Sequence, residues 1–141
     1  MIKLKLNLYP TECNLCGGTV EYISNELIYG KIYGSGKCYH CKKCGAYVGT
    51  HQPRPKEALG ILANPQMRQL KIKCHYYFDK LWGAEIQEGY KNKNYYRKKY
   101  YRFLAKKLNI SEKDCHFGYF DLKLLEKAHI ILKNKVLKMT I

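Results

Sequence analysis

Cys13-Asn14-Leu15-Cys16-Gly17 and Cys41-Lys42-Lys43-Cys44-Gly45 are two copies of one short pattern, and this pair decides how the first part of the chain folds. Two residues between the cysteines let both sulfur atoms of a pair reach one ion across a tight turn, and two such pairs complete a tetrahedral zinc site. The glycine after each second cysteine can adopt a positive φ, so that the backbone folds back over the metal. We therefore expect Cys13, Cys16, Cys41 and Cys44 to hold one structural zinc ion.

The second pair can be read in another register. Cys38-Tyr39-His40-Cys41 is also a Cys-x-x-Cys sequence, and His40 offers a nitrogen ligand. A glycine follows Cys44 but not Cys41, which favours Cys41 and Cys44 as the pair. Cys38 and His40 remain the alternative ligands.

The cysteines could instead form disulfides, as they do in small secreted proteins. Seven cysteines is an odd number, the first residues contain no apolar signal core, and no apolar run approaches transmembrane length. These features favour reduced thiols and a cytoplasmic location.

Residues 1–52 are predicted to form a zinc ribbon, that is, β-hairpins carrying two zinc knuckles. Apolar and polar residues alternate over residues 2–8, which is typical of a strand with one buried face. Residues 19–24 and 27–33 are rich in residues that favour strands, and Gly34-Ser35-Gly36 supplies a turn back to the second knuckle.

Residues 53–141 are predicted to form a basic helical module. The prolines and glycine between residues 50 and 64 indicate an ordered linker. Asn64-Pro65 is a helix start, and that helix should end at Gly83 near Trp82. Its apolar stripe makes Cys74 a core thiol.

Two further helices complete the module. They are expected over residues 92–108 and after an Asp121 cap, with a capping-box turn at Ser111 between them and a short strand over residues 135–141. The fold class is therefore α+β: a zinc ribbon packed on a small three-helix unit, the two forming one compact unit.

The formal net charge of +15 points to an anionic partner. Residues 53–107 hold fourteen Lys and Arg against four acids, whereas residues 1–52 hold six against three. The basic segment is rich in tyrosine rather than in the leucine and tryptophan of a membrane-surface helix. Nucleic acid or an acidic protein is therefore favoured over a membrane.

The helix expected at residues 92–108 is the most basic element. Eight Lys and Arg and no acid lie between residues 90 and 107, so the usual pairing of opposite charges along a helix is missing. We expect these cations to meet phosphates and a tyrosine to stack on a base; the alternative is an ordinary solvated face. The candidate partner-binding residues are Lys42, Lys43, Arg54, Arg68, Lys93, Arg97, Lys98, Tyr101, Arg102 and Lys106.

A second polar site is conceivable at His51, His75, Asp79 and His116. His75 and Asp79 are four residues apart on one helix face, and the other two histidines could join them in a metal or acid–base site. A structural hydrogen-bonded set is the alternative. A hydrolytic metal site usually needs several carboxylates, and this chain has three aspartates, so no catalytic residue is assigned.

Several motifs resemble a family of small zinc-finger-containing proteins carried mainly by bacteriophages and prophages. The matching stretches are Cys41-x-x-Cys44-Gly45-Ala46-Tyr47-Val48-Gly49-Thr50-His51, Leu59-Gly60-x-Leu62-Ala63, Arg68, His75-x-x-Phe78-Asp79-x-Leu81-Trp82 and Cys115-His116-x-Gly118-x-Phe120-Asp121. The resemblance covers roughly residues 13–125 and implies a protein of a mobile element.

The expected function is that of a non-enzymatic zinc-binding protein that binds DNA, RNA or a host nucleoprotein through its basic, tyrosine-rich helix. One alternative is a phage-encoded inhibitor of a host defence or nucleic-acid-processing complex, acting by protein contact. A metal-dependent nuclease is less favoured. The sequence does not distinguish DNA from RNA and indicates no oligomeric state.

Overall fold

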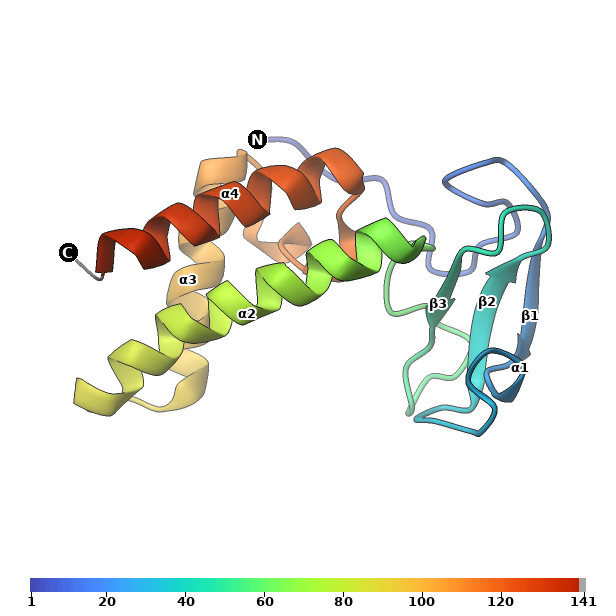
Figure 1. Cartoon of the computed structure of the whole chain (residues 1–141), viewed down its shortest axis with the longest axis horizontal. Helices are drawn as coiled ribbons and strands as arrows, with labels where there is room; N and C mark the ends of the chain where they lie inside the picture. The colour runs from blue at the N-terminus through green and yellow to red at the C-terminus, as the bar shows by residue number, and fades with distance from the viewer. Residues whose placement is uncertain (140–141) are drawn as a thin grey trace. The chain divides into compact units, whose positions relative to one another are not determined.

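The computed structural model describes residues 1–139 and confirms the α+β class, with a small antiparallel sheet and several helices (Figure 1). The chain divides into two compact units. One, here called the ribbon unit, is Lys5–Gln66, and the other, the helical unit, combines Met1–Leu4 with the chain from Met67 onward.

The ribbon unit is built on three antiparallel strands: β1 (Val20–Ser24), β2 (Lys37–Cys41) and β3 (Tyr47–Gly49). Strand β2 lies in the middle of the sheet (Figure 1). Its register aligns Cys41 with Val20 and Cys38 with Gly49. The second knuckle therefore begins at the end of the central strand, where the sheet holds it in place.

The strand expected over residues 27–33 is wrong. Glu26–Tyr29 forms the short helix α1, and the partner of β1 is β2. The buried side chain of Asn25 donates to the Tyr33 carbonyl (2.7 Å) and accepts from its N–H (3.2 Å). This local bonding closes a loop and so competes with strand formation.

The strand expected over residues 2–8 is also wrong, although its alternation is real. In this segment only Ile2 forms a β-bridge, to Ile110. Leu4, Leu6 and Leu8 are nevertheless half-buried while the residues between them are exposed. Alternation requires an extended backbone but not a neighbouring strand, so the pattern fits both arrangements.

The segment 53–66, placed in the helical module from the sequence, lies along the edge of β3. Tyr47 and Ala63 exchange two backbone hydrogen bonds (3.2 and 3.0 Å), and Leu59 donates to Gly49 (2.9 Å). The segment is ordered, as expected of the linker, and its contacts group it with the ribbon unit.

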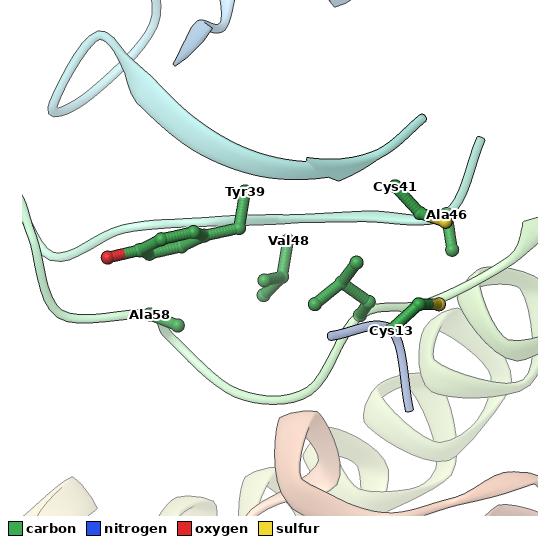
Figure 2. Close-up of a cluster of buried hydrophobic side chains, with 7 residues drawn as sticks. Cys13, Tyr39, Cys41, Ala46, Val48 and Ala58 are labelled. Carbon is green, nitrogen blue, oxygen red and sulfur yellow. The ribbon is translucent and has the colours of Figure 1, made fainter. Parts of the chain in front are cut away.

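This edge segment completes the core of the ribbon unit. Figure 2 shows Tyr39 and Ala58 toward one end of the core, Val48 in the middle, and Cys13 and Cys41 at the other end. The apolar core thus continues directly into the cysteine pairs.

Up to residue 139, the helical unit contains three long helices, as predicted, and two 3₁₀ turns. The elements are α2 (Pro65–Glu88), α3 (Lys93–Leu108), η1 (Glu112–Asp114), η2 (Phe117–Tyr119) and α4 (Leu122–Met139). In Figure 1, α3 crosses behind α2 and α4. Asn92 caps α3 through the Tyr95 N–H (3.1 Å), and Asp121 caps α4 through the Leu124 N–H (2.9 Å).

Two expected boundaries in this unit are wrong, and one expected capping contact is absent. Helix α2 continues through Gly83 to Glu88, because a glycine inside a helix costs only about 1 kcal/mol and packing can offset it. The side chain of Ser111 makes no capping hydrogen bond. Residues 135–139, expected to start a strand, belong to α4, and residues 140–141 lie outside the described residues.

The core of the helical unit is apolar and aromatic. Its fully buried side chains include Phe78, Leu104, Phe120 and Leu125. Cys74 is also fully buried, which confirms it as a core thiol, and its sulfur lies 3.6 Å from the carbonyl oxygen of Leu125. None of the described helices is both long and apolar enough to span a membrane.

Candidate functional site

The two cysteine pairs have the same backbone hydrogen bonds. Cys13 donates to the carbonyl of Gly18 (2.8 Å), and Gly17 donates back to Cys13 (2.9 Å). Cys41 and Gly45 repeat the arrangement, with Cys41 donating to Ala46 (2.8 Å). Gly17 and Gly45 have φ of 75° and 82°, the positive values expected for the glycine after each second cysteine. Each pair is thus a closed knuckle.

The four knuckle sulfurs meet at one point. The Sγ atoms of Cys13, Cys16, Cys41 and Cys44 all lie within 4.8 Å of one another, with Cys13–Cys44 at 3.7 Å and Cys16–Cys41 at 3.4 Å. Zinc–sulfur bonds of about 2.3 Å in a tetrahedron place sulfurs about 3.8 Å apart, so the cluster fits this ion closely. The four cysteines form a structural zinc site, and the sequence-based register is confirmed.

Backbone N–H groups prepare these sulfurs for a cation. Leu15 donates to Cys13 Sγ (3.3 Å), and Cys44 donates to Cys41 Sγ (3.4 Å). The Cys44 N–H lowers the pKa of the Cys41 thiol to about 6. The N–H of Ala46 acts in the same direction on Cys44, but burial and the neighbouring sulfurs together raise the pKa of that thiol to about 12. The lowered pKa of Cys41 favours its thiolate, the form that a metal ion requires.

The alternative ligands Cys38 and His40 lie elsewhere. Cys38 is buried inside β2 and its pKa is raised, chiefly by burial, which favours a neutral thiol. His40 Nδ1 lies 2.9 Å from a carboxylate oxygen of Glu21. Neither belongs to the sulfur cluster.

Gly18 is a site residue that the sequence analysis missed. A Cβ atom at this position would lie 2.7 Å from the Cβ of Lys43 and 3.0 Å from the sulfur of Cys41. The two knuckles therefore approach each other across the bare backbone of this glycine. The Gly17-Gly18 doublet was the available signal.

A second candidate surface is the exposed face of α3. Lys98, Arg102 and Lys106 follow one another at four-residue spacing, and all three are exposed. Tyr95 lies on the same face with 54% of its surface exposed. We call these four residues the α3 basic face.

Tyr101 and Arg97, two of the candidate partner-binding residues, are half-buried rather than exposed. The Tyr101 ring packs against Phe78, with ring centroids 4.4 Å apart, and the Arg97 guanidinium carbon lies 5.9 Å from the Tyr101 centroid. Burial raises the pKa of Tyr101, so its hydroxyl stays protonated. The exposed aromatic ring on this helix belongs to Tyr95. The sequence analysis named Tyr101 as a binding residue and did not name Tyr95.

A pocket of about 600 Å³ lies beside this helix. Four of its lining residues come from α3 and four from the segment between α3 and α4: Asn94, Arg97, Lys98, Tyr101, Glu112, Lys113, Cys115 and His116. The structure thus brings Arg97, Lys98 and Tyr101 of the predicted binding set together with His116 of the predicted polar set.

The other candidate binding residues are dispersed. On the ribbon unit, Lys42 and Lys43 are exposed in the second knuckle, and Arg54 Nε pairs with Glu57 at 2.8 Å. On the helical unit, Arg68 is half-buried, and the Lys93 ammonium lies over the ring of Trp82.

The four candidates for a second polar site have separate partners. His51 lies 3.5 Å from Glu57 in the ribbon unit. The His75 and His116 rings pack edge-on to Phe117 and Tyr119. Asp79 accepts from an indole N–H at 2.8 Å.

No metal centre gathers around these four side chains. Within residues 1–139, the cysteine cluster is the only group of three or more His, Cys, Asp or Glu side chains whose ligand atoms converge. Desolvation lowers the pKa of both His75 and His116, which favours their neutral forms.

The fold and the four-cysteine site define a structural zinc protein. A family described as a zinc-finger-containing domain matches residues 9–135, and the chain belongs to this family. No curated protein and no solved structure matches the chain. The expected zinc-finger family is thereby confirmed.

Proposed function

We propose that this protein binds the phosphate backbone of nucleic acid through the α3 basic face, with the zinc site as scaffold and no catalytic role. The observation that carries the proposal is the run of Lys98, Arg102 and Lys106 on one exposed face of a helix without a single acid. Phosphate contacts of this kind supply most of the affinity in sequence-independent binding.

The surroundings of the face support this proposal. Arg102 pairs with the carboxylate of Glu112 at 3.5 Å, and both side chains are largely exposed. Such a surface pair contributes little and can exchange for a phosphate. The exposed ring of Tyr95 offers a surface on which a base can stack, an interaction available to any sequence.

The resemblance to phage and prophage proteins supports a mobile-element origin. The partner would then be DNA, RNA or a host nucleoprotein in the bacterial cytoplasm.

A salt titration of binding to random DNA and RNA tests the proposal. The double variant Arg102→Gln/Lys106→Gln removes two charges from the face, and Lys127→Gln/Lys133→Gln removes two exposed charges from α4 as a matched control. Each lost phosphate contact should lower the slope of log affinity against log salt by about 0.7 to 0.9. We expect the α3 variant to lose most of its affinity and the control to lose little.

Equal losses in the two variants would show that affinity follows overall charge and would contradict an α3 site. Tyr95→Ala should weaken binding to single strands more than to duplexes, because stacking requires an unpaired base.

A protein partner is the second candidate, and the ribbon unit carries an observation in its favour. Leu27 and Ile32 are 76% and 63% exposed, within one short segment around α1. Exposed apolar groups of this kind are typical of protein contacts. An inhibitor of a host complex would ignore free nucleic acid but co-purify with that complex, and Leu27→Ser/Ile32→Ser should abolish the co-purification.

A further inference from the structure

The pocket beside α3 concentrates positive charge in a concave space. Arg97, Lys98 and Lys113 all line it, and its single acidic lining residue is Glu112. Glu112 lies 3.5 Å from Arg102, which is not a lining residue, in an exposed and therefore weak pair. Three cations and one carboxylate thus line a space of about 600 Å³, which leaves it with a net positive charge.

Arg97 is held in place without a carboxylate partner. Its Nε is shielded from solvent and has no hydrogen-bond partner among residues 1–139. Arg97 takes part in none of the ion pairs within this described part of the chain. A guanidinium carries its charge at any physiological pH, so a half-buried one that forms no ion pair among these residues favours an anion beside it.

Uncharged groups in the lining complement these cations. The Tyr101 hydroxyl and the Asn94 amide can each donate a hydrogen bond to an oxygen. His116, favoured in its neutral form, and the buried Cys115 add lining without adding charge. Cations for a phosphate thus lie next to polar and aromatic groups that suit a sugar or a base.

We propose that this pocket binds a phosphate monoester, that is, the terminal phosphate of a nucleic-acid strand or of a free nucleotide. A monoester carries a charge of about −1.5 to −2 at neutral pH, whereas each phosphodiester within a strand carries about −1. Three convergent cations in a concave space match the more highly charged end group. A pocket of this volume is within the usual range for small-molecule sites.

If the ligand is the end of a strand, this inference rests on the proposed nucleic-acid binding. It adds a preference for strands that end in a phosphate. The α3 basic face would follow the strand, and the pocket would hold its end. Lys98 lines the pocket and also belongs to the face, so the two surfaces meet at this residue.

The test compares short single strands that end in a 5′-phosphate, a 3′-phosphate or only hydroxyl groups, by fluorescence anisotropy. We expect a phosphorylated end to bind about tenfold more tightly, the factor typical of a charge-assisted contact. Lys113→Gln should remove this preference while leaving affinity for hydroxyl-ended strands unchanged. Lys127→Gln, an exposed control on α4, should leave both unchanged.

Arg97→Lys separates a folding defect from a binding defect. It keeps the charge but loses the planar fork of donors, so the preference should fall while the helical circular dichroism stays the same. Equal affinities for phosphorylated and hydroxyl-ended strands in the unsubstituted protein would overturn the inference, provided that adenosine monophosphate also fails to bind.

Direct titration with adenosine monophosphate and with inorganic phosphate distinguishes a strand end from a free nucleotide as the source of the bound phosphate. Binding of the mononucleotide that Lys113→Gln abolishes, without any preference for strand ends, would assign the pocket to a free nucleotide. A different result would contradict the proposed function: normal binding of hydroxyl-ended strands by the Arg102→Gln/Lys106→Gln variant. The two proposals can therefore fail independently.

Discussion

At the scale of single residues, the zinc site depends on backbone geometry as much as on its four sulfurs. Gly17 and Gly45 have positive φ and turn the chain under the metal. Gly18 is required for a steric reason instead, because the second knuckle occupies the space in which a side chain at this position would lie. The repeated motif predicted the first two, whereas Gly18 lies outside that motif and only the Gly17-Gly18 doublet marked it.

Gly18→Ala should destabilise the zinc site. The added Cβ would lie 2.7 Å from the Cβ of Lys43, so one knuckle must shift, at a cost of about 1–3 kcal/mol. Zinc affinity measured by competition with a chelator should fall accordingly. Gly49→Ala is the matched control, because its Cβ would make an ordinary 3.5 Å contact with Leu59; an equal loss there would contradict the steric explanation.

Zinc should be released as the pH falls below neutrality. The Cys44 N–H lowers the pKa of Cys41 to about 6 in the fold, below the usual value for a free thiol. This group therefore stabilises the fold above its unfolded pKa, and that contribution is lost as the pH falls through the folded pKa. Bound zinc acts in the same direction, because it requires thiolates.

The measurement is zinc release against pH, followed with a coloured chelator. The unsubstituted protein and Cys38→Ser should give superimposable curves, since Cys38 lies outside the cluster. Cys44→Ser should bind zinc weakly at every pH. A shifted curve for Cys38→Ser would contradict the ligand assignment.

At the scale of elements, the helices were easier to predict than the strands. The expected range of residues 92–108 agrees with α3 to within one residue, because Asn92 caps its start and Asn109 adopts a left-handed conformation at its end. Such signals act within a few residues along the chain. The strand partner of β1 depends on contacts across the fold, and the local preference of residues 27–33 was misleading.

Gly83→Ala should stabilise the helical unit. Gly83 lies inside α2, and a Cβ built there meets nothing within 4 Å. Alanine restricts the unfolded chain and favours helix, for a gain of about 0.5–1 kcal/mol. Chemical denaturation followed by helical circular dichroism would measure it. An unchanged or lower midpoint would indicate that α2 ends near Trp82, as the sequence analysis expected.

At the scale of the whole molecule, stability has two separate sources. The ribbon unit has a short sheet and a core that ends at the cysteines, so the metal supplies much of its folding free energy. The helical unit buries larger apolar and aromatic side chains and contains no residue of the zinc site.

Removal of zinc with a strong chelator should therefore unfold the ribbon unit and spare the helices. Hydrogen exchange should rise across β1, β2 and β3, whereas α3 and α4 keep their protection and most of the helical circular dichroism remains. Readdition of zinc should restore the ribbon. Loss of protection in α3 to the same extent as in β2 would contradict separate stabilisation.

The sequence by itself determined the zinc ligands, the three helices and the location of the basic charge, because each of these depends on residues close together in the chain. Cys-x-x-Cys-Gly is a local turn, an Asn or Asp cap acts on the next few residues, and the absence of acids in α3 is visible by inspection. Tertiary structure alone decided which side chains of α3 face solvent and which line the pocket. Tyr101 and Arg97 are half-buried because Phe78 and the segment after α3 pack against them, and Lys113 joins Arg97 only through that packing. The exposure of a side chain depends on residues that pack against it from distant parts of the chain. The helical period of apolar residues identifies one buried face of a helix but not which segments cover its other faces.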